Sequence, residues 1–309
     1  MKYVKYIFAV GALLLLGSAA LADDPLRFTD WGPPENLGPV INSPYLDSCV
    51  SISKNGLSLY FSSNRHTGNP GSTDRDLYVS QRAGKDEPWG EPYRLWMLNT
   101  SAWDSCPALS LDEHRLYFTS ARRDSSCGNT DTRDIWVSHR HDRRDDLGWE
   151  SPVNLGCAPD GVNSAGDDLF PTFFEDETGR VLMYSGSTRA GTAGPMDLYE
   201  SEQNGDGSFG PATPIAELNS PAMEHSVTVR RDGLEVIFGS TRNTGQLRFW
   251  TATRASTSDP WSPPVPVTSL PAGGSGRYAL SFDGRELYFA APNPGTGLDI
   301  WVARREKLR

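Results

Sequence analysis

The stretch DSCPALSLDEHRLYFTS at residues 104–120, followed by DIWVSHR at residues 134–140, decides the fold because related stretches recur along the chain. Each copy has an acidic residue before an apolar segment, then a polar turn, a second apolar segment, and a third that ends near a basic residue. The acidic position is Asp47, Asp104, Asp168 and Glu224, with Ser275 in the fifth copy, and successive copies lie 51 to 64 residues apart. A period of this length indicates a repeat architecture.

The segments of each copy are typical of short β-strands. They are rich in β-branched and aromatic residues, and dipeptides such as Asn55-Gly56 and Asp283-Gly284 mark tight hairpin turns between them. No stretch after residue 22 has a convincing helical period. Four strands in each of five copies predict an all-β fold, a five-bladed β-propeller of four-stranded antiparallel blades.

Proline indicates how the strands are ordered within a blade. Because Pro cannot donate a hydrogen bond to a central ladder, the fourth segment belongs on the outer edge and the acidic position on the innermost strand. The prolines concerned are Pro34, Pro92, Pro152, Pro214 and Pro264. Residues 31–37 match a fourth segment, whereas the chain ends after a third. We therefore expect residues 31–37 to complete the last blade and close the ring, which makes residues 23–309 a single propeller domain.

Residues 1–22 have the pattern of a cleaved secretory signal peptide. Lys2 and Lys5 supply the positive charge, residues 7–16 the apolar core, and Ala20-Leu21-Ala22 the small-residue cleavage site. A membrane anchor is the weaker interpretation because the apolar run is short and no positive flank follows it. We expect a periplasmic or secreted protein without membrane insertion.

The charge of the chain narrows the class of partner. The formal net charge is −10, and loss of Lys2 and Lys5 with the leader makes it more negative. This balance argues against a nucleic acid, which needs a basic footprint, and against attraction to anionic lipid. We expect a monomer whose partner is a protein or a glycan.

Export makes disulfides possible for the cysteines. Cys127 and Cys157 fall in loops expected on the same face of adjacent blades, so a bridge between them is plausible. Cys49 and Cys106 occupy identical repeat positions near the axis, where they would either bridge or remain small buried thiols. No C-x-x-C metal or redox motif is present.

The repeat resembles a known family. The pattern N-S-x-x-x-D-x-x-P-x-x-S-x-D-G-x-x-L-Y-F-x-S-x-R, followed by D-I-W-V-S-x-R and W-x-x-P-x-x-L, is similar to the TolB-type, WD-like β-propeller repeat. The resemblance covers essentially the whole chain after the leader, starting at Asn42, Asn99, Asn163 and Asn219. It implies the propeller fold but no single function, since members serve as periplasmic scaffolds, substrate-gating domains of peptidases and envelope proteins.

The first candidate site is the ring of acids Asp47, Asp104, Asp168 and Glu224 at matching ends of the innermost strands. Clustered carboxylates can bind a cation or serve as the acid and base of a glycosidase. A residue repeated in four blades is better explained as a cap that accepts backbone N–H hydrogen bonds. The repeat therefore favours a structural role for these acids.

The second candidate site follows from departures from the repeat. An Arg follows the second strand in four copies, and we expect it to pair with an Asp before the third strand, as Arg65 would with Asp76. In the fourth copy Arg248 replaces that Asp, and in the fifth Asn293 replaces the Arg. Two interpretations of these exceptions remain open: Arg242, Arg248 and Arg277 are freed to bind an anionic or carbonyl group, or the terminal blades have simply drifted from the repeat.

Glu224 and His225 form the third candidate, because a Glu beside a His near a channel mouth could bind metal or shuttle a proton. A lone His is more often a satisfied polar residue. The sequence has no G-x-S-x-G, H-E-x-x-H or P-loop motif, and we expect no cofactor and no dedicated metal site.

Two functions remain open from the sequence. The first is a non-enzymatic module that binds a protein or an envelope or extracellular glycan through its loop face and axial channel. The alternative is a carbohydrate-active, glycosidase-like enzyme that uses inner-ring carboxylates as acid and base. An enzyme of this kind requires two of these carboxylates to face an open pocket, free of backbone hydrogen bonds.

Overall fold

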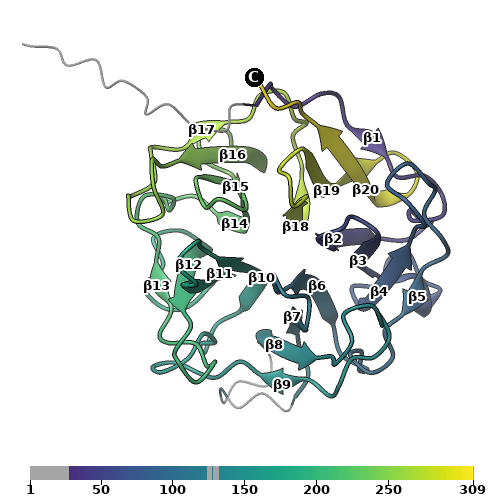
Figure 1. Ribbon diagram of the computed structural model, residues 1–309, viewed down its shortest axis with the longest axis horizontal. Coiled ribbons are helices and arrows are strands. Elements are labelled where there is room, and N and C mark those ends of the chain that lie inside the picture. The colour runs from purple at the N-terminus through teal and green to yellow at the C-terminus, as the bar shows by residue number, and fades with distance from the viewer. Residues whose placement is uncertain (1–27, 124–126, 128–131, 309) are drawn as a thin grey trace, which may run out of the picture.

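The structure is a computed structural model, and it describes residues 28–123, 127 and 132–308. Within these residues the chain forms five four-stranded antiparallel sheets arranged in a ring (Figure 1). The one helical turn among them is the short 3-10 segment η1 (Arg65–Thr67). The predicted five-bladed β-propeller is confirmed. The expected signal peptide, residues 1–22, lies outside the described residues.

Each blade runs outward from the axis in chain order. Blade one comprises β2 (Asp47–Ile52), β3 (Ser58–Ser63), β4 (Asp76–Gln81) and β5 (Tyr93–Arg94). Blade two comprises β6 (Asp104–Leu109), β7 (Arg115–Ser120), β8 (Asp134–His139) and β9 (Val153–Asn154). Blade three comprises β10 (Asp168–Glu175), β11 (Val181–Ser187), β12 (Asp197–Glu202) and β13 (Thr213–Pro214). Blade four comprises β14 (Glu224–Val229), β15 (Glu235–Ser240), β16 (Arg248–Thr253) and β17 (Val265–Pro266). Blade five comprises β18 (Ser275–Leu280), β19 (Glu286–Asn293), β20 (Gly297–Arg304) and, from the other end of the chain, β1 (Glu35–Asn36).

The N-terminal strand closes the ring. Strand β1 pairs antiparallel with β20, with Glu35 opposite Val302 and Asn36 opposite Trp301, and it forms the outer edge of blade five (Figure 1). An isolated bridge between Phe28 and Lys307 extends this pairing. The outer edge of β20 is therefore paired with β1. This pairing protects a sheet edge that would otherwise be free to pair with another chain.

The blades are held together by apolar side chains that alternate along the second strands. In β3, Leu59 and Phe61 pack toward Tyr288 of blade five, whereas Tyr60 between them packs toward Phe118 of blade two. This alternation follows from the two-residue period of a strand. Because side chains of one strand pack against both neighbouring blades, the core is a ring of blade-to-blade contacts. Full burial of one such side chain contributes about 1.5–3 kcal/mol to the stability of the fold.

Each innermost strand carries a bulge at the same level. A positive φ occurs two residues after the acidic position in four blades, at Cys49, Cys106, Phe170 and Ser226, and one residue after Ser275, at Gly276, in blade five. The register of the first two strands shifts at this point in every blade. Because a bulge bends the strand and redirects its side chains, these residues approach the axis together.

Two disulfides join neighbouring parts of the ring. Cys49 and Cys106, whose state the sequence left open, form a bridge between β2 and β6. The expected bridge between Cys127 and Cys157 is also present. Among the residues that the structure describes, no helix has the length and apolar character to cross a membrane.

Candidate functional site

The four ring acids are fully buried in matching ion pairs. Each lies at the start of an innermost strand and pairs with the Arg that follows the second strand of its own blade, and the side chain of each acid has 0% exposure. The pairs, with their N–O distances, are Arg65–Asp47 at 2.7 Å, Arg122–Asp104 at 2.9 Å, Arg189–Asp168 at 2.6 Å and Arg242–Glu224 at 3.0 Å.

The same carboxylates also cap the backbone. Asp104 accepts hydrogen bonds from the Thr100 backbone N–H at 2.6 Å, the Thr100 hydroxyl at 2.8 Å and the Ser120 hydroxyl at 2.5 Å. The backbone N–H groups of Ser43, Ser164 and Ser220 donate to the acids of the other three blades. A buried carboxylate with these partners has its charge neutralised and its lone pairs occupied. The ring acids are therefore built into the scaffold and are not presented to a ligand.

The expected partner of the repeated Arg was the Asp before the third strand, and the structure differs. Asp76 instead contacts Arg94 and His66, and Asp197 accepts backbone N–H groups of its own loop. Blade four keeps a complete pair because Glu224, on the innermost strand, is the true partner of Arg242. Arg242 is thus occupied, contrary to the expectation that blade four has freed it, and Glu224 is engaged as its partner. Arg248 begins β16 as an exposed residue.

Arg277 is buried and crosses the axis. Its Nη1 donates to the Val50 carbonyl of blade one at 2.5 Å, and its Nε donates to the Pro171 carbonyl of blade three at 2.7 Å. Burial lowers the pKa of this guanidinium to about 9. With the Cys49–Cys106 bridge beside it, Arg277 fills the axis rather than facing a ligand.

His225 is separated from Glu224 by the strand. Successive side chains of a strand point to opposite faces. Glu224 thus reaches Arg242, while the ring of His225 lies near the rings of Phe170 and Tyr278, at centroid distances of 5.3 Å and 6.3 Å. Burial lowers the pKa of His225 to about 4. The two residues do not form a joint metal or proton-transfer site, and no group of metal-ligating side chains gathers elsewhere in the described ranges.

The accessible chemistry lies at the other end of the innermost strands, on the face formed by the hairpin turns that follow them. We call this the turn face. Every blade places the second residue of its four-residue hairpin turn on this face, and the type of residue differs from blade to blade. These residues are Lys54, Leu111, Glu177, Arg231 and Phe282. Phe282 is a large aromatic side chain with 41% exposure.

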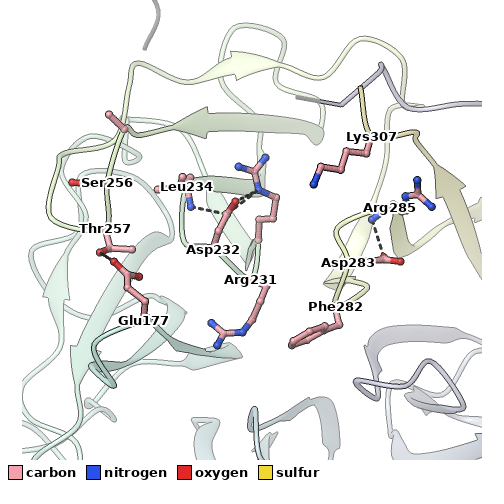
Figure 2. A pocket seen from close by; sticks show the side chains of 12 residues that line it. Glu177, Arg231, Asp232, Leu234, Ser256, Thr257, Phe282, Asp283, Arg285 and Lys307 are labelled. Atoms are coloured by element: carbon pink, nitrogen blue, oxygen red, sulfur yellow. Dashed lines mark hydrogen bonds and ion pairs between the residues drawn. The ribbon is translucent and has the colours of Figure 1, made fainter. Parts of the chain in front are cut away.

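Three cavities meet at Phe282 on the turn face. An axial cavity of about 120 Å³ lies at its centre, lined by residues of all five blades. A first flanking cavity of about 930 Å³ lies over blades one and two and shares Lys54, Glu113 and Phe282 with the axial cavity. A second flanking cavity of about 850 Å³ lies over blades four and five and shares Arg231 and Phe282 with it (Figure 2). Together these cavities form a groove across the turn face.

Glu113 is the residue of this groove that breaks the repeat most clearly. Its φ is 61°, and the same turn position in the other blades is Gly56, Gly179, Gly233 or Gly284, each with positive φ. A side chain at such a φ costs about 1–2 kcal/mol, a cost that glycine avoids. Glu113 is held there by Arg140, whose Nε donates to its carbonyl at 2.7 Å, and by the Lys54 backbone N–H, which donates to its Oε1 at 2.6 Å.

Glu175 is the second carboxylate among the described residues that line the axial cavity. It ends β10 half-buried, and its backbone carbonyl accepts a hydrogen bond from Arg231 Nη1 at 2.7 Å. Arg231 and Lys54 lie on either side of this cavity, 5.9 Å and 4.7 Å from the centroid of the Phe282 ring. The groove therefore brings two carboxylates and one exposed aromatic ring together over the axis.

Sequence reasoning missed Glu113 and Glu175. The signal for Glu113 was present, because Leu111-Asp112-Glu113 is the one turn of the five without a glycine at its end. Strain at a backbone position that a glycine could occupy is a reason to suspect function.

No protein-family model matches the chain, and no curated protein matches it in sequence. Solved structures are similar in fold. The catalytic domain of a GH62 alpha-L-arabinofuranosidase from Coprinopsis cinerea has a TM-score of 0.59 at 13% identity, over 91% of this chain and 97% of that one. The endo-arabinase of Bacteroides thetaiotaomicron has a TM-score of 0.58 at 16% identity, over 87% and 97%. TolB from Acinetobacter baumannii has a TM-score of 0.45 at 13% identity, over 86% and 56%.

These comparisons correct the expected function. We expected a non-enzymatic binding module first and a glycosidase second, yet similar structures include arabinofuranosidases and an arabinase. They favour the carbohydrate-active alternative, and at 13–16% identity the likeness itself establishes the shared β-propeller fold.

Proposed function

We propose that this protein is a carbohydrate-active enzyme that cleaves glycosidic bonds in the groove of the turn face. Glu113 and Glu175 are the pair of carboxylates that would carry the reaction. The Lys54 backbone N–H engages one oxygen of Glu113, Oε1, so the other carboxylate oxygen would be the one that reacts. The observation that carries the proposal is Glu113, a strained glutamate at a glycine position that lines both the axial cavity and the first flanking cavity.

The arrangement suits glycoside hydrolysis in two ways. Such hydrolysis uses one carboxyl group to protonate the leaving oxygen and a second to act as a nucleophile or to activate water. The axial cavity holds both groups, and the flanking cavities extend on either side of it, so the scissile bond of an oligosaccharide would lie over the axis. Exposed Phe282 offers a flat apolar face beside them, on which a sugar ring can stack.

The ring acids have a different part in this proposal. Asp47, Asp104, Asp168 and Glu224 are engaged by arginines and backbone N–H groups, so they hold the blades and do not act as acid or base. The signal-like residues 1–22 support export, which would bring the protein to envelope or extracellular glycans. TolB-type membership is part of the same proposal, supported by the repeat motif.

The test measures turnover of a panel of purified glycans by the release of reducing ends. The Glu113→Gln and Glu175→Gln variants keep the size of the side chain and its capacity to accept a hydrogen bond, so each should fold. Each should lose about two orders of magnitude or more in kcat, which is the usual contribution of a general acid or base. The matched control is Glu91→Gln, an exposed glutamate outside the three cavities, which should retain wild-type turnover. Unchanged turnover in both groove variants would refute the assignment, and no turnover on any glycan would refute the function.

A further inference from the structure

The groove differs in charge from the rest of the molecule. The chain has a formal net charge of −10, yet basic side chains outnumber acidic ones in the first flanking cavity. Lys54, Arg82, Arg140, Arg143 and Arg144 line this cavity, against Glu113 and Asp146. An acidic protein repels polyanions at long range, so a local excess of cations points to a ligand that carries negative charge.

Some of these cations have structural partners and others do not. Arg140 pairs with Asp146 at 2.5 Å, and Arg82 donates to the carbonyls of Gly56 and Lys85. Arg143 and Arg144, in contrast, are exposed on the loop after β8, and no described residue forms an ion pair with either of them. Their charges are therefore available on the wall of the groove.

The second flanking cavity, on the opposite side of the axis, has a smaller excess of basic side chains. Figure 2 shows Arg231, Arg285 and Lys307 on its wall together with the acidic residues Glu177, Asp232 and Asp283. Arg230 also lines this cavity, so four basic side chains stand against three acidic ones. The Glu177 carboxylate accepts a hydrogen bond from the Thr257 hydroxyl at 3.1 Å, and Asp283 accepts one from the Arg285 backbone N–H at 3.2 Å. Cations thus lie along both arms of the groove, on either side of the two central carboxylates.

The centre of the groove combines an apolar ring with charge. Phe282 has Lys54 within 4.7 Å and Arg231 within 5.9 Å of its ring centroid. A sugar that stacks on this ring would have an ammonium and a guanidinium within reach of its substituents. A neutral sugar offers these cations only hydroxyl groups, whereas a carboxylate or sulfate offers charge-assisted hydrogen bonds of about twice the strength.

We infer that the groove takes an anionic oligosaccharide, one whose sugar units carry carboxylate or sulfate groups, with anionic units on both sides of the bond over the axis. The inference rests on the proposed function and specifies its substrate class. Uronate and sulfated chains share the required chemistry, and binding experiments distinguish them.

The test compares binding of three oligosaccharides of equal length by titration calorimetry: a polyuronate, a sulfated chain and a neutral arabinan. The full chain is used as wild type and as Glu113→Gln, which prevents cleavage during the titration. At least one anionic ligand should bind about ten-fold more tightly than the neutral one, equivalent to 1.4 kcal/mol. This preference should shrink when salt is raised from about 50 to 500 mM, because screening weakens exposed charge pairs.

Two double variants, each of which removes two positive charges, test whether the anionic ligand binds in the groove. Arg143→Gln with Arg144→Gln should raise the Kd of the anionic ligand about ten-fold, equivalent to 1.4 kcal/mol, and leave that of the neutral ligand unchanged. The control is Arg123→Gln with Arg248→Gln, which removes two exposed cations from the opposite face and should leave both constants unchanged.

The outcomes separate this inference from the proposed function. Equal binding of neutral and anionic chains, or equal effects of the two double variants, overturns the anionic substrate class. Turnover of a neutral glycan that Glu113→Gln abolishes would then leave the proposed function standing. Selective anionic binding without turnover of any glycan supports the substrate class and refutes the hydrolysis.

Discussion

Replacing Asp104 by Ala tests whether the ring acids are structural. The change removes the acceptor of four hydrogen bonds, from the Thr100 backbone and hydroxyl, the Ser120 hydroxyl and Arg122 Nη2. It leaves the Arg122 guanidinium, whose side chain is 9% exposed, without its counter-ion. Breaking a buried pair from one side costs about 3–5 kcal/mol, so the free energy of unfolding should fall by that amount.

Urea unfolding followed by tryptophan fluorescence measures this loss. The control Glu91→Ala, at an exposed position, should stay within about 0.5 kcal/mol of wild type. The double variant Asp104→Ala with Arg122→Met removes both charges and should recover at least about 1 kcal/mol relative to Asp104→Ala alone. A loss below 1 kcal/mol for Asp104→Ala would show that the reasoning about the buried pair is wrong.

Three further predictions follow from other buried or strained groups. Glu113→Gly should be about 1 kcal/mol more stable than Glu113→Ala, since both lose the carboxylate and only Ala keeps a Cβ at the φ of 61°; equal stabilities in urea would remove the argument from strain. His225, with its pKa lowered by burial to about 4, stays neutral in the fold, while the unfolded chain takes up the proton near pH 6.5. Its contribution to stability is therefore complete above pH 6.5 and is lost as pH falls toward 4, and wild type should lose about 2 kcal/mol more than His225→Gln between pH 7 and pH 5; parallel pH profiles of unfolding free energy would contradict this. Arg277→Ala should destabilise by about 3 kcal/mol or more, because the Val50 and Pro171 carbonyls lose their donors inside a filled axis; near-wild-type stability in thermal unfolding would show that the axis is solvated.

The sequence was sufficient to predict the ring because the repeat fixes it. The period, the prolines of the fourth segments and the match of residues 31–37 together predict five blades and the closure that β1 and β20 make. Each of these features can be recognised within a short segment of the sequence, and the same kinds of segment recur from blade to blade.

Side-chain partners were harder to predict because, in blades one to three, two acids lie within reach of the repeated Arg along the sequence. Arg65 is 18 residues from Asp47, its actual partner, and closer in sequence to Asp76. Antiparallel pairing of β2 and β3 brings the more distant acid alongside, with Asp47 opposite Ser63. The choice depends on how the strands pair and turn, and spacing alone does not contain it.

The candidate site was the least predictable part. Glu113 and Phe282 come from hairpin turns of different blades, and they line one cavity because the ring brings those turns together. The sequence shows that Glu113 replaces a glycine, but only the structure shows that the position has positive φ and faces a groove.

The most direct test measures initial rates per folded molecule for Glu113→Gln and Asp104→Asn on the same glycan. Glu113→Gln should lose about 100-fold or more in kcat. Asp104→Asn, once corrected for its folded fraction, should stay within about two-fold of wild type, because Asp104 is buried against Arg122 and lines none of the three cavities. The reverse result, full activity in Glu113→Gln and loss in Asp104→Asn, would place the chemistry in the acid ring and refute the roles assigned to Glu113 and Asp104.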